Sequence, residues 1–122
     1  MEDNIISKRT TMEVLDHHIT HLAAGNLEEV VMDYADDAFI VTMNGVVKGK
    51  DEIRAFFENN IKNVLPPDSV NIIEKKTVHG EIGYIVWNAV SKYYRFRFGT
   101  DTFVIKNGRI VMQTFAGITE KL

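Results

Sequence analysis

The residue pattern changes character at Pro66 and Pro67, the only prolines of the chain. Before this pair, apolar residues recur mainly at the three- and four-residue spacing of one helix face. After it, long runs rich in β-branched and aromatic residues are typical of strands. Helices gathered in one half and strands in the other predict an α+β domain. With 122 residues and no linker or repeat, residues 1–122 are expected to form a single domain.

Three helices are expected, over residues 10–24, 27–34 and 51–63. Thr10 or Thr11 is expected to cap the first helix, which Gly25 ends. Asp51 is the expected N-cap of the third helix.

The strands are expected at residues 38–43, 46–47, 70–78, 82–94, 97–105 and 109–117. Asn44-Gly45 and Asn107-Gly108 predict tight hairpin turns, whereas the turn near residues 91–95 has neither Gly nor Pro. Long antiparallel strands coil strongly, and helices packed on the concave side leave a conical space. The sequence therefore predicts three N-terminal helices packed on a strongly curved antiparallel sheet, with an internal apolar pocket as the ligand site.

The charge distribution excludes some partners. The net charge is −3 and the basic residues are scattered, which argues against nucleic acid because phosphate binding needs a concentrated basic face. There is no cysteine, so neither a disulfide nor a thiolate metal site is expected. Without a signal-peptide pattern or a long apolar run, we expect a cytoplasmic protein with no membrane partner.

Several segments together resemble the nuclear-transport-factor-2-like (NTF2-like) superfamily, nearest its SnoaL-like and ketosteroid-isomerase-like branch. The segments are Ala24-Gly25-Asn26-Leu27-Glu28, Tyr34-Ala35-Asp36-Asp37-Ala38, Lys48-Gly49-Lys50-Asp51-Glu52-Ile53 with Phe56-Phe57, and the closing Asp101-Thr102-Phe103 and Asn107-Gly108-Arg109-Ile110. The resemblance covers nearly the whole chain and implies a cone-shaped α+β barrel. It does not imply one function, because this scaffold carries isomerases, dehydratases, cyclases, hydrolases and binding modules.

The resemblance also implies three site positions. Ketosteroid isomerases use a carboxylate base on the first strand and two oxyanion donors. The donor positions fall on His18 and Asp101, and the base position falls on Thr42. Threonine cannot abstract the proton of a carbon acid at neutral pH without a strong base beside it, so the isomerase mechanism in its known form is not expected. Asn44, on the same strand face, could offer a hydrogen bond but not a base.

Asp101 and His18 are the candidate catalytic residues. Asp101 shares a strand face with Phe103 and Ile105, and a carboxylate on an apolar face either pairs or acquires a raised pKa. A structural Asp bonded to the backbone or to Arg97 is the alternative. His18 lies at the edge of the apolar helix stripe and is either a bonded core residue or the acid–base partner of Asp101. The discriminating observation is whether both side chains open into one cavity.

His17 and His21 are one helical turn apart, a spacing that can share a metal. The sequence identifies no further ligand, so we expect solvated surface histidines, no metal site and no cofactor.

The aromatic residues of the strands could be core, interface or pocket. The expected ligand-binding residues are Thr42, Asn44, Phe57, Trp87, Phe103 and Phe115. Because both faces of the strand at residues 82–94 are largely apolar, one face is expected to pack on the helices and the other on a second subunit. We expect a homodimer through this sheet face.

Two functional hypotheses follow. The first is a small-molecule-binding protein of unassigned role whose pocket takes a small apolar or cyclic ligand. The alternative is an acid–base enzyme of the polyketide cyclase, dehydratase or isomerase type, acting on a small cyclic or carbonyl substrate. A protein-interaction module follows from the resemblance alone.

Overall fold

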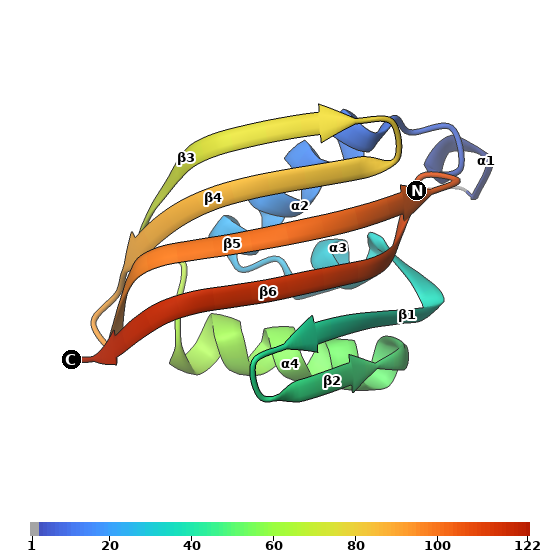
Figure 1. Cartoon of the computed structure of the whole chain (residues 1–122). Coiled ribbons are helices and arrows are strands. Elements are labelled where there is room, and N and C mark those ends of the chain that lie inside the picture. The colour runs from blue at the N-terminus through green and yellow to red at the C-terminus, as the bar shows by residue number, and fades with distance from the viewer. Residues whose placement is uncertain (1–2) are drawn as a thin grey trace.

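Four helices and six strands form the chain in the computed structural model, which describes residues 3–122 (Figure 1). The helices are α1 (Asp3–Ile6), α2 (Thr11–Ala24), α3 (Leu27–Met32) and α4 (Gly49–Asn63). The strands are β1 (Tyr34–Thr42), β2 (Gly45–Lys48), β3 (Val70–His79), β4 (Ile82–Val90), β5 (Tyr94–Lys106) and β6 (Arg109–Lys121). Within the described residues, none of the helices has the length and apolar character needed to cross a membrane.

The six strands form one curved sheet in the order β2-β1-β6-β5-β4-β3 (Figure 1). Helices α2 and α3 lie behind the sheet in this view, and α4 packs against β1 and β2. The predicted α+β fold with helices on a strongly curved sheet is confirmed. One pairing differs, because β1 runs parallel to β6, which makes the sheet mixed rather than entirely antiparallel.

The N-terminal half is organised by well-defined helix ends. The Thr10 hydroxyl accepts a hydrogen bond from the Glu13 amide, and the Glu13 carboxylate accepts one from the Thr10 amide, which completes a capping box for α2. Gly25 ends α2 in the left-handed conformation, with φ of 76°. The prediction of Asp51 as the cap of α4 is wrong. The helix begins two residues earlier, and Glu52 accepts a hydrogen bond from the Lys48 amide.

The strand boundaries differ from the predicted ones at a turn that is stabilised by side-chain hydrogen bonds rather than by glycine or proline. The β4–β5 turn is built around Ser91, whose hydroxyl accepts hydrogen bonds from the amides of Tyr93 and Tyr94. The Ser91 hydroxyl also donates to the Val64 carbonyl, which ties this turn to the end of α4. Consequently β4 ends at Val90, earlier than expected, and β5 and β6 are longer than expected.

The hydrophobic core lies between the helices and the sheet. Its fully buried members come from α2, α3, α4 and all the central strands, and include Val14, Leu15, Val30, Ile40, Ile53, Phe103 and Ile110. Between α2, α4 and the strands β3 to β6, this core gives way to a cavity.

Candidate functional site

A cavity of about 210 Å³ lies between α2, α4 and the sheet. Its walls are mostly apolar, and its polar side chains come from both layers. The lining residues are His18, Ile19, Leu22, Ala23, Phe56, Phe57, Asn60, Leu65, Asn71, Ile73, Ile85, Trp87, Phe96, Asp101, Phe103, Gln113 and Phe115. A concave apolar space with a few polar groups is the usual form of a small-molecule site.

Asp101 is the acidic group of this cavity and is only 8% exposed. It lies on β5 on the same face as Phe103 and Ile105, as the alternation of side chains predicts. Its two carboxylate oxygens accept separate hydrogen bonds, one from the Trp87 indole at 2.7 Å and one from the Gln113 amide at 2.7 Å. Arg97, the alternative partner considered from the sequence, pairs with Glu120 instead.

Burial dominates the protonation equilibrium of Asp101. It raises the pKa of this carboxyl group from its ordinary 3.8 to about 6, while the hydrogen bonds from Trp87 and Gln113 partly oppose the rise by favouring the charged form. At neutral pH the group is therefore a carboxylate whose nearest donors are neutral. It can act as a hydrogen-bond acceptor or as a base within an apolar cavity.

A buried chain of hydrogen bonds supports this carboxylate. The Tyr34 hydroxyl donates to the Gln113 carbonyl oxygen, and the Gln113 amide in turn donates to Asp101. The chain fixes the orientation of Gln113. Burial, followed by the negative charges of Asp101 and Asp33, raises the pKa of Tyr34 well above its ordinary value, so Tyr34 remains a neutral donor.

Gly99 makes room for the Trp87 side chain. A Cβ atom at Gly99 would lie 2.3 Å from the indole ring, closer than atoms can approach. Trp87 therefore crosses β5 at Gly99, its cross-strand neighbour, to reach Asp101. On its way the indole packs against Phe96 and Phe115.

His18 also lines the cavity, but it does not pair with Asp101. Both Asp101 oxygens are held by residues of the sheet, and the nearest acid to His18 is Asp33, with 3.9 Å between His18 Nδ1 and Asp33 Oδ2. This Nδ1 atom is buried and has no hydrogen-bond partner within residues 3–122. The predicted His18–Asp101 pair is thus not formed, although the two side chains share one cavity.

Aromatic rings surround His18 and determine its charge state. Tyr34, Phe57 and Phe103 each contact its imidazole ring edge-on, with centroids 5.3–5.8 Å away. This burial lowers the pKa of His18 from 6.5 to about 4, against the opposing effect of Asp33. The imidazole is neutral at physiological pH.

The other predicted ligand-binding residues divide into two groups. Phe57, Trp87, Phe103 and Phe115 line the cavity, whereas Thr42 and Asn44 do not. Thr42 is at the end of β1, where its hydroxyl donates to the Gly45 carbonyl and accepts from the Asn44 amide. These two residues stabilise the exposed β1–β2 turn, and no residue of β1 is among those that line the cavity.

Sequence reasoning missed three polar residues near the cavity: Gln113, Tyr34 and Asp33. The sequence position of Gln113 could have revealed it, because Gln113 and Phe115 share one face of β6 and Gln113 lies opposite Phe103. Asp33 is completely buried, where it accepts hydrogen bonds from Arg9 at 2.8 Å and from His17 at 2.9 Å. The His17 side chain is only 16% exposed and bonds to Asp33 and Glu29, so the expectation of a solvated surface histidine is wrong for His17. His21 is half-buried and lies beside Asn26.

Comparisons with known proteins identify the fold. No protein-family model matches the chain, and no curated protein matches its sequence. Among solved structures, an NTF2-like protein of unknown function from Cytophaga hutchinsonii has a TM-score of 0.75 at 12% identity, over 91% of this chain and 92% of that one. This chain therefore has the NTF2-like fold, as the resemblance implied.

Two further solved structures have names that refer to enzymes. A putative ketosteroid isomerase from Kribbella flavida has a TM-score of 0.75 at 14% identity, over 88% of this chain and 77% of that one. The epoxide hydrolase/cyclase-like enzyme SalBIII, which has a role in pyran ring formation in salinomycin, has a TM-score of 0.78 at 12% identity, over 92% of this chain and 95% of that one. At these identities the similarity establishes the shared fold, on which different activities occur.

Proposed function

We propose that this protein binds a small, largely apolar ligand in the cavity and anchors the ligand's polar group on Asp101. The observation that carries the proposal is a carboxylate held by Trp87 and Gln113 in the wall of an apolar cavity. A cavity of about 150 Å³ holds a benzene-sized molecule. The volume of about 210 Å³ therefore suits a molecule of one or two rings.

The state of Asp101 defines the polar group of the ligand. An ionised carboxylate has about four lone-pair sites and no donor. Protein donors occupy one site on each oxygen of Asp101. The ligand is therefore expected to supply a hydroxyl or amine donor, while the aromatic residues of the wall contact its ring.

The proposal is tested by measuring the affinity of wild-type protein and Asp101→Asn for one- and two-ring compounds that carry a hydroxyl or amine. In the variant, Gln113 can rotate its amide and Tyr34 can accept from it, so the hydrogen-bond chain can re-form without the charge. We expect donor-bearing ligands to lose at least tenfold in affinity, and matched ligands without the donor to lose little. Equal affinity of both proteins for every compound would contradict the proposal.

A second candidate function is acid–base catalysis with Asp101 as the base. The raised pKa of about 6 favours it, because a base titrating just below neutral pH is both ionised and reactive. The substrate would be a small cyclic or carbonyl compound that presents an acidic C–H or a hydroxyl to Asp101. The names of the putative ketosteroid isomerase and the cyclase-like enzyme with this fold are compatible with such chemistry.

Turnover separates the two functions. Any compound that binds in the cavity should be incubated with the protein and examined for isomerisation, dehydration or cyclisation. Catalysis predicts turnover that falls at least a hundredfold in Asp101→Asn and follows an ionisation near pH 6. A compound that binds without being converted would support the first function, ligand binding without catalysis.

We also propose a homodimer through the sheet face that is turned away from the helices. Large apolar side chains are exposed on this face, including Phe39, Val41, Tyr84, Phe98 and Ile118. Phe98 and Ile118 are directly opposite each other on β5 and β6. Exposed apolar side chains gathered on one sheet face are typical of an interface.

Sedimentation of wild-type protein, Phe98→Glu and the control Ile5→Glu tests the dimer. Ile5 is also exposed but lies on α1. A dimer that dissociates only in Phe98→Glu supports the proposed interface, and a monomeric wild type excludes it.

A further inference from the structure

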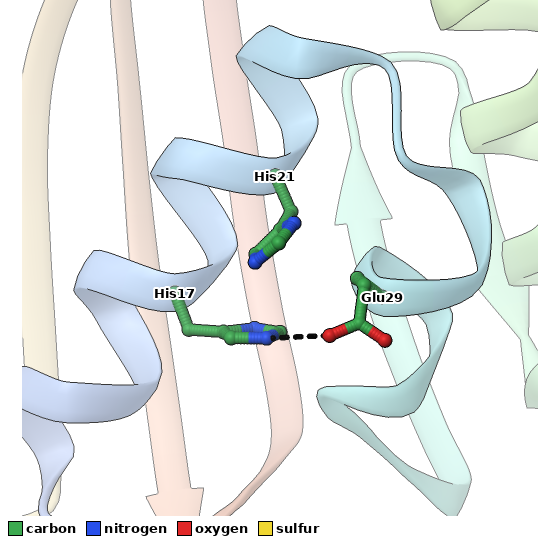
Figure 2. Close-up of side chains that lie close together, drawn as sticks. All are labelled: His17, His21 and Glu29. Carbon is green, nitrogen blue, oxygen red and sulfur yellow. Dashed lines mark hydrogen bonds and ion pairs between the residues drawn. The ribbon is translucent and has the colours of Figure 1, made fainter. Parts of the chain in front are cut away.

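Two histidines of α2 and one glutamate of α3 lie close together (Figure 2). His17, His21 and Glu29 each offer one ligand atom, and these atoms all lie within 4.8 Å of one another. All three side chains are half-buried, and none lines the cavity. The group is therefore separate from the proposed ligand site.

The spacing of these atoms is close to that of a metal centre. His17 Nε2 lies 3.1 Å from Glu29 Oε1 (Figure 2). Ligand atoms bound about 2.1 Å from a tetrahedral zinc ion are separated by roughly 3.4 Å. The His21 ring is one helical turn along α2 from His17, with 4.2 Å between the ring centroids. A small movement of the His21 side chain would complete three ligands around one point.

The surrounding hydrogen bonds orient both imidazole rings. His17 Nδ1 bonds to the buried Asp33, which Arg9 holds in place. A carboxylate on one ring nitrogen directs the other nitrogen toward a metal, an arrangement found around histidine ligands of zinc. The Nδ1 atom of His21 lies 2.9 Å from the side-chain amide of Asn26. With the amide oxygen turned to the ring, Asn26 accepts from Nδ1 and leaves Nε2 free to bind.

We propose that His17, His21 and Glu29 bind a divalent transition-metal ion of the zinc type, with Asp33 orienting His17 and water completing the coordination. Two imidazoles and one carboxylate suit Zn²⁺, Ni²⁺ or Cu²⁺ better than Mg²⁺ or Ca²⁺, which prefer oxygen ligands. The ion would take the place of the proton between His17 and Glu29. It would link α2 to α3, two helices that the sequence joins through Gly25 and Asn26.

The proposal departs from the expectation of no metal site because the third ligand is on a different helix. The sequence shows His17 and His21 at the spacing of one turn. It does not show that the turn after α2 returns Glu29 to the same side. His79, the fourth histidine of the chain, is exposed at the end of β3 and provides a matched control.

The test is calorimetric titration of the untagged full chain with ZnCl₂, because a histidine tag would bind the same metals. Samples are first treated with a chelator and dialysed. We expect one Zn²⁺ per chain, with affinity reduced at least tenfold in His21→Ala and in Glu29→Gln and unchanged in His79→Ala. Co²⁺ should give the visible absorption of a tetrahedral site in the wild type, whereas Mg²⁺ and Ca²⁺ should give no heat.

Two results would overturn the proposal. One is wild-type protein that binds no Zn²⁺ at micromolar concentration. The other is an unchanged Zn²⁺ affinity in both Glu29→Gln and His21→Ala, which would mean that the metal binds elsewhere. Glu29→Gln keeps the shape of a partly exposed side chain, so it remains informative even if His21→Ala fails to fold. Circular dichroism of each variant verifies the fold.

Discussion

Two carboxylates, Asp33 and Asp101, are buried in this protein, one beside a cation and the other beside neutral partners. Asp33 is fully buried and bonds to the Arg9 guanidinium and the His17 ring. Asp101 is 8% exposed, and its partners are the neutral indole of Trp87 and the neutral amide of Gln113. The same side chain at similar depth is thus paired with a cation at position 33, whereas at position 101 it has only neutral partners in the cavity wall.

The difference indicates which acid is structural and which is available for function. The positive charge of Arg9 offsets the cost of burying Asp33. The Asp33 carboxylate therefore has little remaining capacity to bind a ligand. No cation compensates Asp101 among its partners in residues 3–122, so its charge is under-satisfied and faces the cavity. Such an uncompensated group is the expected source of binding or catalysis.

The largest effect is expected from Arg9→Met, which removes the cation beside Asp33. The buried carboxylate would then keep only the His17 ring as a partner, which should lower the free energy of unfolding by about 3–5 kcal/mol. Urea denaturation measures it. Arg97→Met is the control, because the exposed pair of Arg97 with Glu120 is expected to contribute about 1 kcal/mol or less. Equal losses in the two variants would show that Asp33 does not depend on Arg9.

Asp101 should destabilise the protein as the pH rises. Its folded-state pKa of about 6 exceeds its ordinary 3.8, so the folded state binds the proton more tightly than the unfolded chain. Its favourable contribution is complete below about pH 4 and is lost as the pH rises to 6, a change of about 3 kcal/mol.

Asp101→Asn removes this dependence. The difference in stability between the variant and the wild type should therefore shift in favour of the variant as the pH rises from 4 to 7.5. Urea denaturation midpoints at both pH values measure this shift. A constant difference across this range would mean that Asp101 is not desolvated.

Gly99→Ala is expected to disrupt the Asp101 site through Trp87. The new methyl group would overlap the indole, and overpacking of this kind costs about 1–3 kcal/mol. Trp87 is the only tryptophan, so its fluorescence reports the displacement directly. Thr100→Ala, on the next residue of β5, should leave the emission unchanged. An unaltered spectrum in Gly99→Ala would show that the indole does not need this gap.

The smallest effect is expected from Tyr34→Phe. It removes the donor to Gln113 but keeps the ring that contacts His18 and Phe57. Loss of one buried hydrogen bond should cost about 1 kcal/mol by urea denaturation. If the hydrogen bonds of this chain are coupled, Tyr34→Phe should change the free energy of unfolding by a different amount in the Asp101→Asn background than in the wild type. Additive losses in the double variant would argue against that coupling.

The elements were largely predictable, because they depend on local patterns. The Thr10 and Gly25 caps of α2 and the Asn107-Gly108 turn occur where the residue types predict them. The β4–β5 turn lies within the expected residues 91–95, but the ends of the two strands beside it were misplaced because Ser91 forms the turn through side-chain hydrogen bonds. Its effect on strand length could not be inferred from glycine and proline alone.

The site was predictable only in part, because strand irregularities and long-range pairing decide which residues meet. A register shift between Phe96 and Phe98 places Phe96 in the cavity wall and leaves Phe98 exposed on the other face. Thr42 occupied the implied base position, yet it lies at the end of β1, away from the cavity lining, and its hydroxyl bonds to the β1–β2 turn. Neither outcome follows from side-chain alternation alone.

The sequence by itself determined that helices would precede a curved sheet and that Asp101 would share an apolar face with Phe103 and Ile105. Alternation along a strand is a local property that any partner strand preserves. Only the tertiary structure decided that Asp101 bonds to Trp87 and Gln113 while His18 faces Asp33. These partners are distant in the chain, and strand register, curvature and helix docking together bring them into contact.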